Sequence, residues 1–79
     1  INNVFKPVAT NIDPSKFKMT IINRWSNIIF ETTDYNQGWN GRLQSTSELV
    51  PNDMYIYVME FYDAAGNQLI KRGEVYVIR

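Results

Sequence analysis

The side chains that could do chemistry in this 79-residue chain are carboxylates, amines, phenols and hydroxyls, because the sequence contains no His and no Cys. Without those two residue types there is no Ser-His-Asp triad, no thiolate nucleophile, no disulfide and no zinc site with His or Cys ligands. No activating base accompanies the carboxylates. We therefore expect no enzymatic activity and no cofactor. The carboxylate pairs considered as acid and base are Asp53 with Glu60 and Asp63 with Glu74.

A polar stretch between residues 34 and 40 carries oxygen atoms of the kind that calcium prefers, at Asp34, Asn36 and Asn40, with Gly38 among them. The stretch lacks the regular acidic spacing and the closing Glu of a calcium loop. We interpret it as a turn and expect no metal site.

Three side chains could bind a partner through flat or forked groups. Trp25 and Trp39 either form an exposed platform that stacks on sugar rings or fill the ends of a small core, and the size of the chain favours the core. Arg24 either binds a carboxylate or a partner's backbone, or lies over an aromatic ring as a structural cation–π partner. Both interpretations of Arg24 stay open.

The charge balance argues against a polyanionic partner. Eight Lys and Arg residues face eight Asp and Glu residues, which gives a formal net charge of zero. Domains that bind nucleic acid are commonly basic, so we expect no nucleic-acid binding. No run of about 18 apolar residues would span a membrane, and no signal-peptide pattern follows Ile1. We expect no membrane insertion and place any export signal upstream of Ile1.

The elements that must position these side chains are short strands. Hydrophobic residues make up 44% of the chain and aromatic residues 14%, which is too apolar for disorder. Apolar and polar residues alternate over 17–23, and no segment shows a helical stripe. The strands expected are an edge strand at 4–8 interrupted by Pro7, a hairpin of 17–23 with 28–32, a central strand at 53–62 and a last strand at 68–78 that bends at Gly73.

The connections are predicted from polar residues that favour turns. Residues 11–15, 23–27 and 63–67 read as turns, and 33–48 as a long loop that holds at most one short strand. The whole chain, 1–79, is expected to be a single domain. We predict an all-β fold, a small immunoglobulin-like antiparallel β-sandwich of about six to seven strands, with an incomplete barrel as the alternative.

Four blocks of this sequence resemble, in order and spacing, the gliding-motility-associated C-terminal domain, which is the type B sorting domain of the type IX secretion system in Bacteroidota. The blocks are 23–27 (Asn-Arg-Trp-Ser-Asn), 37–41 (Gln-Gly-Trp-Asn-Gly), 50–57 (Val-Pro-Asn-Asp-Met-Tyr-Ile-Tyr) and 73–79 (Gly-Glu-Val-Tyr-Val-Ile-Arg). Together they extend over essentially the whole chain.

The sequence departs from the family pattern in three places. Residues 1–5 match only the tail of the family's acidic opening block, with Asn3 where Asp is usual, so we expect the N-terminal part of the family module to be missing. Ser26 stands where the family has Gly, at a position expected to need a positive φ. Asp53 also replaces a Gly, and Asp tolerates the left-handed region better than most residues.

The resemblance implies a non-catalytic C-terminal sorting signal, which directs a larger cargo, with a gliding-motility adhesin as a candidate, through the periplasm to the cell surface or medium. The implied partners are the type IX machinery and a PorP/SprF-like outer-membrane protein, with no small-molecule substrate. We expect recognition by the 23–27 corner and by a last strand that ends flush with the chain. The expected partner-binding residues are Arg24, Trp25, Asn27, Gly73, Val75, Val77, Ile78 and Arg79.

Two functions of other classes compete with the sorting signal. One is an adhesive or glycan-binding immunoglobulin-like module whose Trp and Tyr side chains form the contact face. The other is a structural spacer, which would neither direct export nor bind a ligand. Because the net charge is zero, binding of a sorting partner should depend only weakly on salt.

Overall fold

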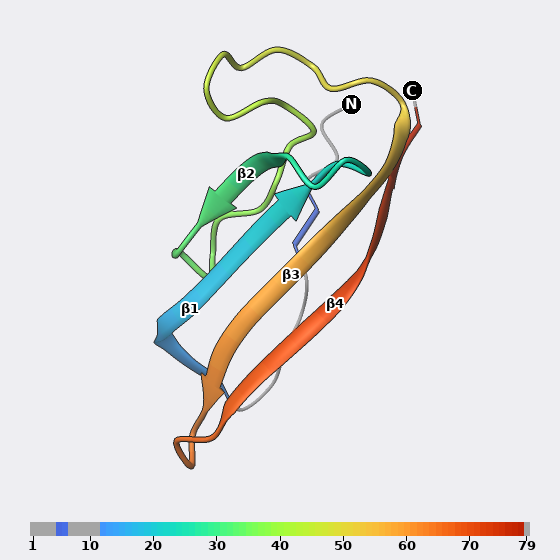
Figure 1. The fold of residues 1–79 in the computed structure, drawn as a ribbon. Helices are drawn as coiled ribbons and strands as arrows, with labels where there is room; N and C mark the ends of the chain where they lie inside the picture. Colours follow the sequence, from blue (N-terminus) through green and yellow to red (C-terminus); the bar gives the residue numbers. More distant parts are fainter. Residues whose placement is uncertain (1–4, 7–11, 79) are drawn as a thin grey trace.

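The computed structural model describes residues 5–6 and 12–78, and these residues form one antiparallel sheet (Figure 1). Its strands are β1 (Ile12–Ile22), β2 (Ile28–Thr32), β3 (Asp53–Asp63) and β4 (Gln68–Val77). They lie in the order β2-β1-β3-β4. The predicted all-β, antiparallel class is confirmed. The described part of the chain contains no helix that is long and apolar enough to cross a membrane.

The period-2 pattern of β1 gives the sheet its buried face. Phe17, Met19 and Ile21 are 5%, 1% and 0% exposed, so the alternation over 17–23 correctly predicted a strand with one face in the core. The predicted strand at 53–62 corresponds to β3, which lies between β1 and β4 as an inner strand. The predicted strand at 68–78 corresponds to β4, at the edge of the sheet.

The turn predicted at residues 11–15 is wrong as an element boundary, because β1 already begins at Ile12. The turn chemistry is nevertheless present. The Asp13 carboxylate accepts hydrogen bonds from the Ser15 backbone N–H (3.0 Å) and hydroxyl (2.6 Å). The register then shifts between Ile12, which pairs with Asp63, and Phe17, which pairs with Phe61. The polar residues therefore make a bulge inside the strand.

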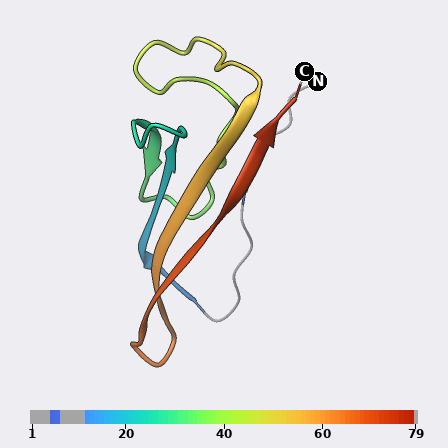
Figure 2. The ribbon, with the colours of Figure 1, turned by 45° about the vertical axis from the view of Figure 1, so that its right-hand side comes forward.

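The described residues contain fewer strands than the six to seven predicted. The predicted strand at 4–8 lies mostly outside the described residues, and Phe5 within it forms an isolated bridge with Trp39. The long connection between β2 and β3 forms a second isolated bridge, Arg42 with Leu49. The rest of that connection is turns and irregular backbone. It arches over the end of the sheet where β3 begins (Figures 1 and 2).

This connection completes the core through Trp39 and Val50, which are 1% and 2% exposed. The ring of Trp39 meets Tyr55 edge to face, with 5.4 Å between centroids. Its indole N–H donates to the Arg42 carbonyl at 3.0 Å, so the buried polar group is satisfied. The connection, with its bridges to Phe5 and between Arg42 and Leu49, therefore forms a second layer on the buried face of the described sheet, as the predicted small sandwich requires.

At Gly73, where a bend is predicted, the structure shows a regular ladder and a close contact with an aromatic ring. The β3–β4 register runs from Asp53–Val77 to Tyr62–Gln68 without a shift. A Cβ built at Gly73 would overlap the ring of Tyr57, its cross-strand partner. That ring also packs against Phe5, with 5.1 Å between centroids. Gly73 is therefore required by the close approach of an aromatic ring.

We expect Gly73→Ala to lower the free energy of unfolding by about 1–3 kcal/mol, because the added methyl forces Tyr57 out of its position. Urea denaturation measures the effect. In a Tyr57→Val background the same substitution should be neutral or slightly stabilising, since alanine is less flexible than glycine in the unfolded chain. A stabilising Gly73→Ala in the otherwise unchanged chain would contradict this account.

Candidate recognition site

The predicted partner-binding residues lie mainly at one end of the sheet. Arg24, Trp25 and Asn27 belong to the connection between β1 and β2. Val77, near the end of β4, pairs with Asp53 at the start of β3. Arg24 bonds to the same Asp53, which brings the β1–β2 hairpin and the end of β4 to one site. Arg79 lies outside the described residues.

The hairpin corner is organised by Asn23. Its side-chain oxygen accepts the backbone N–H groups of Trp25 and Asn27, both at 2.9 Å. Its carbonyl accepts the N–H of Ser26 at 3.0 Å, and its N–H donates to Asn27 at 3.1 Å. The predicted turn at 23–27 is confirmed. Ser26 has φ +67°, so the positive φ predicted for this position is also confirmed.

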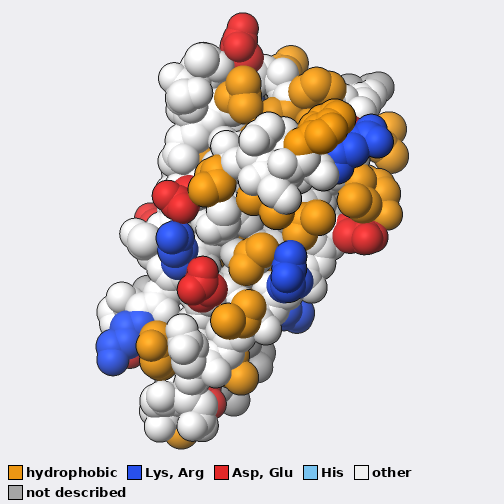
Figure 3. Space-filling view, in the orientation of Figure 1, with side chains coloured by type: hydrophobic (Ala, Val, Ile, Leu, Met, Phe, Trp, Pro, Cys, Tyr) orange, Lys and Arg blue, Asp and Glu red, His pale blue; other side chains and the backbone are white. Residues whose placement is uncertain are grey.

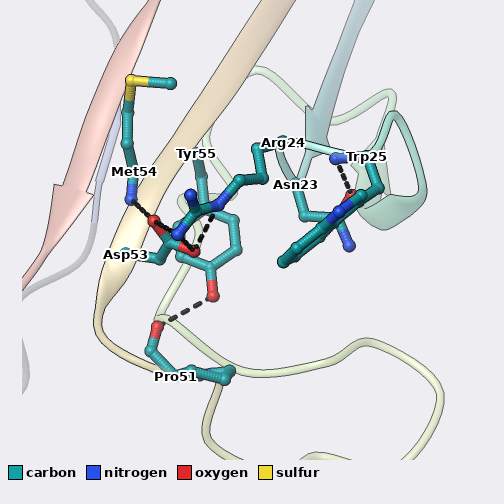
Figure 4. A network of polar contacts seen from close by, with 7 residues as sticks. All are labelled: Asn23, Arg24, Trp25, Pro51, Asp53, Met54 and Tyr55. Atoms are coloured by element: carbon teal, nitrogen blue, oxygen red, sulfur yellow. Dashed lines mark hydrogen bonds and ion pairs between the residues drawn. The ribbon is translucent and has the colours of Figure 1, made fainter.

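Arg24 holds this corner against β3 (Figure 4). Its Nε lies 3.1 Å from Asp53 Oδ2, and its Nη2 lies 2.8 Å from Oδ2 and 3.0 Å from Oδ1. This forked geometry fixes direction as well as distance. It joins residues 29 positions apart in the sequence. Arg24 and Asp53 together are called the clasp below.

The Asp53 carboxylate also caps the first residues of β3. Its Oδ1 accepts the Met54 backbone N–H at 2.7 Å. That bond, followed by the Arg24 guanidinium, holds the pKa of Asp53 below its ordinary value. Asp53 does not occupy the left-handed region that its replacement of a family glycine had indicated; the described non-glycine residues with positive φ are Ser26 and Ser47. Asp53 therefore acts through its carboxylate, and this position does not need a residue that tolerates positive φ.

The two tryptophans have opposite environments. Trp39 is buried in the core, as predicted from the size of the chain. Trp25 is 68% exposed, so the same prediction is wrong for Trp25. The turn directs its ring outward, where the Arg24 guanidinium carbon lies 5.2 Å from the ring centroid. The structural cation–π interpretation of Arg24 is therefore confirmed, and the carboxylate that its guanidinium binds is Asp53 of the same chain.

Exposed apolar side chains surround the clasp. Trp25, Ile28, Tyr76 and Ile78 are 68%, 63%, 62% and 83% exposed. An open depression lies beside them. Figure 3 shows hydrophobic side chains gathered around a basic group at this end of the molecule. The residues that line the depression are Asn52, Asp53, Met54, Tyr76, Val77 and Ile78. The exposed residues Trp25, Ile28, Tyr76 and Ile78, together with Met54, are called the hairpin-end surface below.

The structure divides the predicted residues of the last strand. Gly73, Val75 and Val77 are half-buried, and both valines pack against the core. Tyr76 and Ile78 are exposed, and Tyr76 pairs with Met54 on the outer face of the sheet. Sequence reasoning missed Ile28, Met54 and Tyr76 as surface residues. The period-2 pattern could have found Met54 and Tyr76, because each alternates with a core-facing neighbour.

The candidate calcium stretch is a turn, as predicted. The Asp34 carboxylate accepts the Asn36 backbone N–H at 2.9 Å, and the Asp34 carbonyl accepts the Gln37 N–H at 3.0 Å. The carboxylate therefore organises its own backbone.

Comparison with known proteins connects this arrangement to a family. Residues 1–77 match the family model described as CHU_C Type IX secretion signal domain. No curated protein and no solved structure matches the chain significantly. The match extends over almost the whole chain and includes the hairpin corner, the clasp and β4.

We expect Ser26→Gly to raise the free energy of unfolding by up to about 1 kcal/mol, because glycine removes the penalty of a positive φ. Chemical denaturation is the measurement. Thr20→Gly, within β1, is the matched control and should destabilise the chain by about 0.5–1 kcal/mol. A Ser26→Gly variant that loses stability would contradict the claim that the positive φ of Ser26 destabilises the turn.

Because of the clasp, thermal stability should fall as the pH is lowered into the acid range. A carboxylate whose folded-state pKa is lowered stabilises the fold above its ordinary pKa, and this contribution is lost as pH falls through the folded value. Asp53→Asn should therefore flatten the loss of thermal stability below about pH 4. Arg24→Gln should show an intermediate profile, because the Met54 N–H bond remains. If Asp53→Asn follows the unchanged chain at every pH, the clasp contributes nothing.

Proposed function

This chain belongs to the type IX secretion signal domain family, and we propose that it directs a larger cargo protein through the type IX secretion system to the cell surface or medium. The observation that carries the proposal is the family match over residues 1–77. In this role the domain is an address rather than a catalyst. The cargo reaches the periplasm through a separate N-terminal signal, and the folded domain is then recognised at the outer membrane.

The partner in this proposal is a PorP/SprF-like outer-membrane protein, and the proposed cargo class is a gliding-motility adhesin of a Bacteroidota cell. Both follow from the resemblance of the four sequence blocks to type B sorting domains. The zero net charge supports recognition by local features rather than by long-range electrostatic steering.

The proposed contact is the hairpin-end surface together with the clasp beside it. Four apolar side chains there are more than half exposed, so covering them stabilises a complex by about 25 cal/mol per Å² of apolar area removed from water. Arg24 is bonded to Asp53 and lies over Trp25, so the indole is partly held before a partner arrives. Such preorganisation lowers the entropy lost on binding.

The arrangement of the carboxylates supports a non-catalytic role. Asp53 bonds to Arg24 and to the Met54 N–H. Asp63 accepts the backbone N–H groups of Ala65 and Asn67 in the β3–β4 turn. These two members of the candidate acid–base pairs therefore support backbone and hairpin geometry.

A glycan-binding module is the second candidate, because Trp25 is exposed as a sugar-stacking platform would be. Arg24 already lies over its ring, and Trp39 is buried, so the described chain offers one partly covered indole. That arrangement supports the sorting role over sugar stacking. Tryptophan fluorescence with a glycan panel separates the two, since only a glycan-binding module would respond through Trp25.

We expect the chain, fused to the C-terminus of a periplasmic reporter in a type IX host, to export the reporter. Trp25→Ala and Ile78→Ala should each reduce export at least about tenfold, as expected for central side chains of an interface. Immunoblots of medium, surface and periplasmic fractions give the measurement.

Leu49→Ala is the matched control, because Leu49 is 54% exposed and lies outside the hairpin-end surface. It should leave export unchanged. Retention of the unaltered fusion in the periplasm would refute the sorting role. Full export of both surface variants would leave the sorting role standing but show that the hairpin-end surface is not the contact.

A further inference from the structure

The two edges of the sheet differ in whether their outward backbone groups are hydrogen-bonded. At the β2 edge, Gln44 occupies the outward backbone groups. Its N–H donates to the Ile29 carbonyl at 3.2 Å, its side-chain oxygen accepts the Glu31 N–H at 3.1 Å, and its side-chain amide donates to the Glu31 carbonyl at 2.9 Å. This edge is thus capped against pairing with another strand.

The β4 edge has no comparable cap among the described residues. Its strand neighbour is β3, and no described loop or side chain bonds to its outward backbone groups. The edge is also apolar in places, since Leu69, Ile70 and Tyr76 are 44%, 63% and 62% exposed. An uncapped edge of this length is a template for strand addition.

The sequence of β4 is complementary to itself about Gly73. In an antiparallel pair of two β4 strands centred on Gly73, Arg72 of each copy lies opposite Glu74 of the other. On the same face, Ile70 of each copy lies opposite Tyr76 of the other. Opposite charges and aromatic–aliphatic pairs at facing positions stabilise a ladder. We propose that β4 pairs antiparallel with β4 of a second copy of this chain, centred on Gly73, to form a homodimer with a continuous sheet.

Registers centred on a charged residue are less favourable. A twofold axis perpendicular to the sheet keeps each side chain on its own face, so the centre of the pair must fall on a residue. Centring on Lys71, Arg72 or Glu74 places that charge directly opposite its own copy, which is destabilising. Centring on Gly73 avoids this, and it also places Leu69 opposite Val77 on the inner face.

Among the described residues, neither charge needed for this pairing is held in an ion pair. Among the described residues, Arg72 takes part in no ion pair, whereas Lys18 and Arg24 do. Glu74 accepts the Tyr76 hydroxyl at 2.9 Å through Oε1, which leaves Oε2 for an arginine of the second copy.

The assembly should stop at two copies. A twofold contact uses the same surface on both partners and is closed by symmetry. The remaining edges of the joined sheet are the two β2 edges, which Gln44 caps. Trp25 does not take part in the β4 pair, whereas Tyr76 belongs both to the pair and to the hairpin-end surface. Dimerisation itself needs no secretion machinery, so it can be measured separately from the proposed sorting function.

Sedimentation equilibrium of the purified 79-residue chain tests the proposal. The unaltered chain should show a concentration-dependent monomer–dimer equilibrium. Arg72→Glu and Glu74→Arg should each weaken it about tenfold or more, because both ion pairs become like-charge pairs. The double variant Arg72→Glu/Glu74→Arg should recover the dimer.

Lys71→Glu is the matched control, since it makes the same charge change on the same strand but faces Val75 of the second copy; it should leave the dimer in place. An Ile70→Cys/Tyr76→Cys variant should form an intermolecular disulfide on oxidation, in a chain that otherwise has no cysteine. A chain that stays monomeric at its highest soluble concentration would overturn the proposal. So would a dimer that tolerates both single charge reversals or that the double variant does not restore.

Discussion

Covering one face of a four-stranded sheet is the constraint on which this structure depends. In the described part of this 79-residue chain, the connection between β2 and β3 covers that face with Trp39 and Val50. Trp39 is the largest of the fully buried side chains, and its indole N–H is bonded within the connection. Small domains bury a limited share of their surface, which makes a large aromatic side chain effective here. The opposite face and the ends are left to carry side chains that contact solvent or a partner.

The sequence predicted the strands better than the connections. Alternation located β1, because burial of one face imposes a period of two on a strand. The run at 53–62, apolar on both faces, located β3 as an inner strand. The residues around Asp13 predict a turn but form a bulge, since a carboxylate that bonds a nearby backbone N–H favours both structures. The cover by the 33–52 segment could not be predicted, because it depends on which distant surface Trp39 meets rather than on any local pattern.

In the candidate site too, features set by local sequence were predicted and features set by distant contacts were not. The 23–27 corner follows from local turn chemistry, and the positive φ at Ser26 was predicted from the resemblance, in which Gly stands at that position. The bond between Arg24 and Asp53 joins residues far apart in the sequence, and only the folded sheet brings them together. Trp25 was expected in the core on account of its size, but the turn directs its ring outward. Side-chain direction in a hairpin connection depends on backbone geometry that residue type alone does not specify.

The clasp connects the fold to the proposed role, because it holds the exposed indole at a fixed place beside the end of β4. The most direct test is site-specific photocrosslinking in a type IX host, with a photoreactive phenylalanine analogue at position 25 of the exported fusion and at position 49 as the reference. The account predicts a crosslink to an outer-membrane protein of the secretion machinery from position 25 and not from position 49. Crosslinks from both positions alike, or from neither while export proceeds, would contradict it.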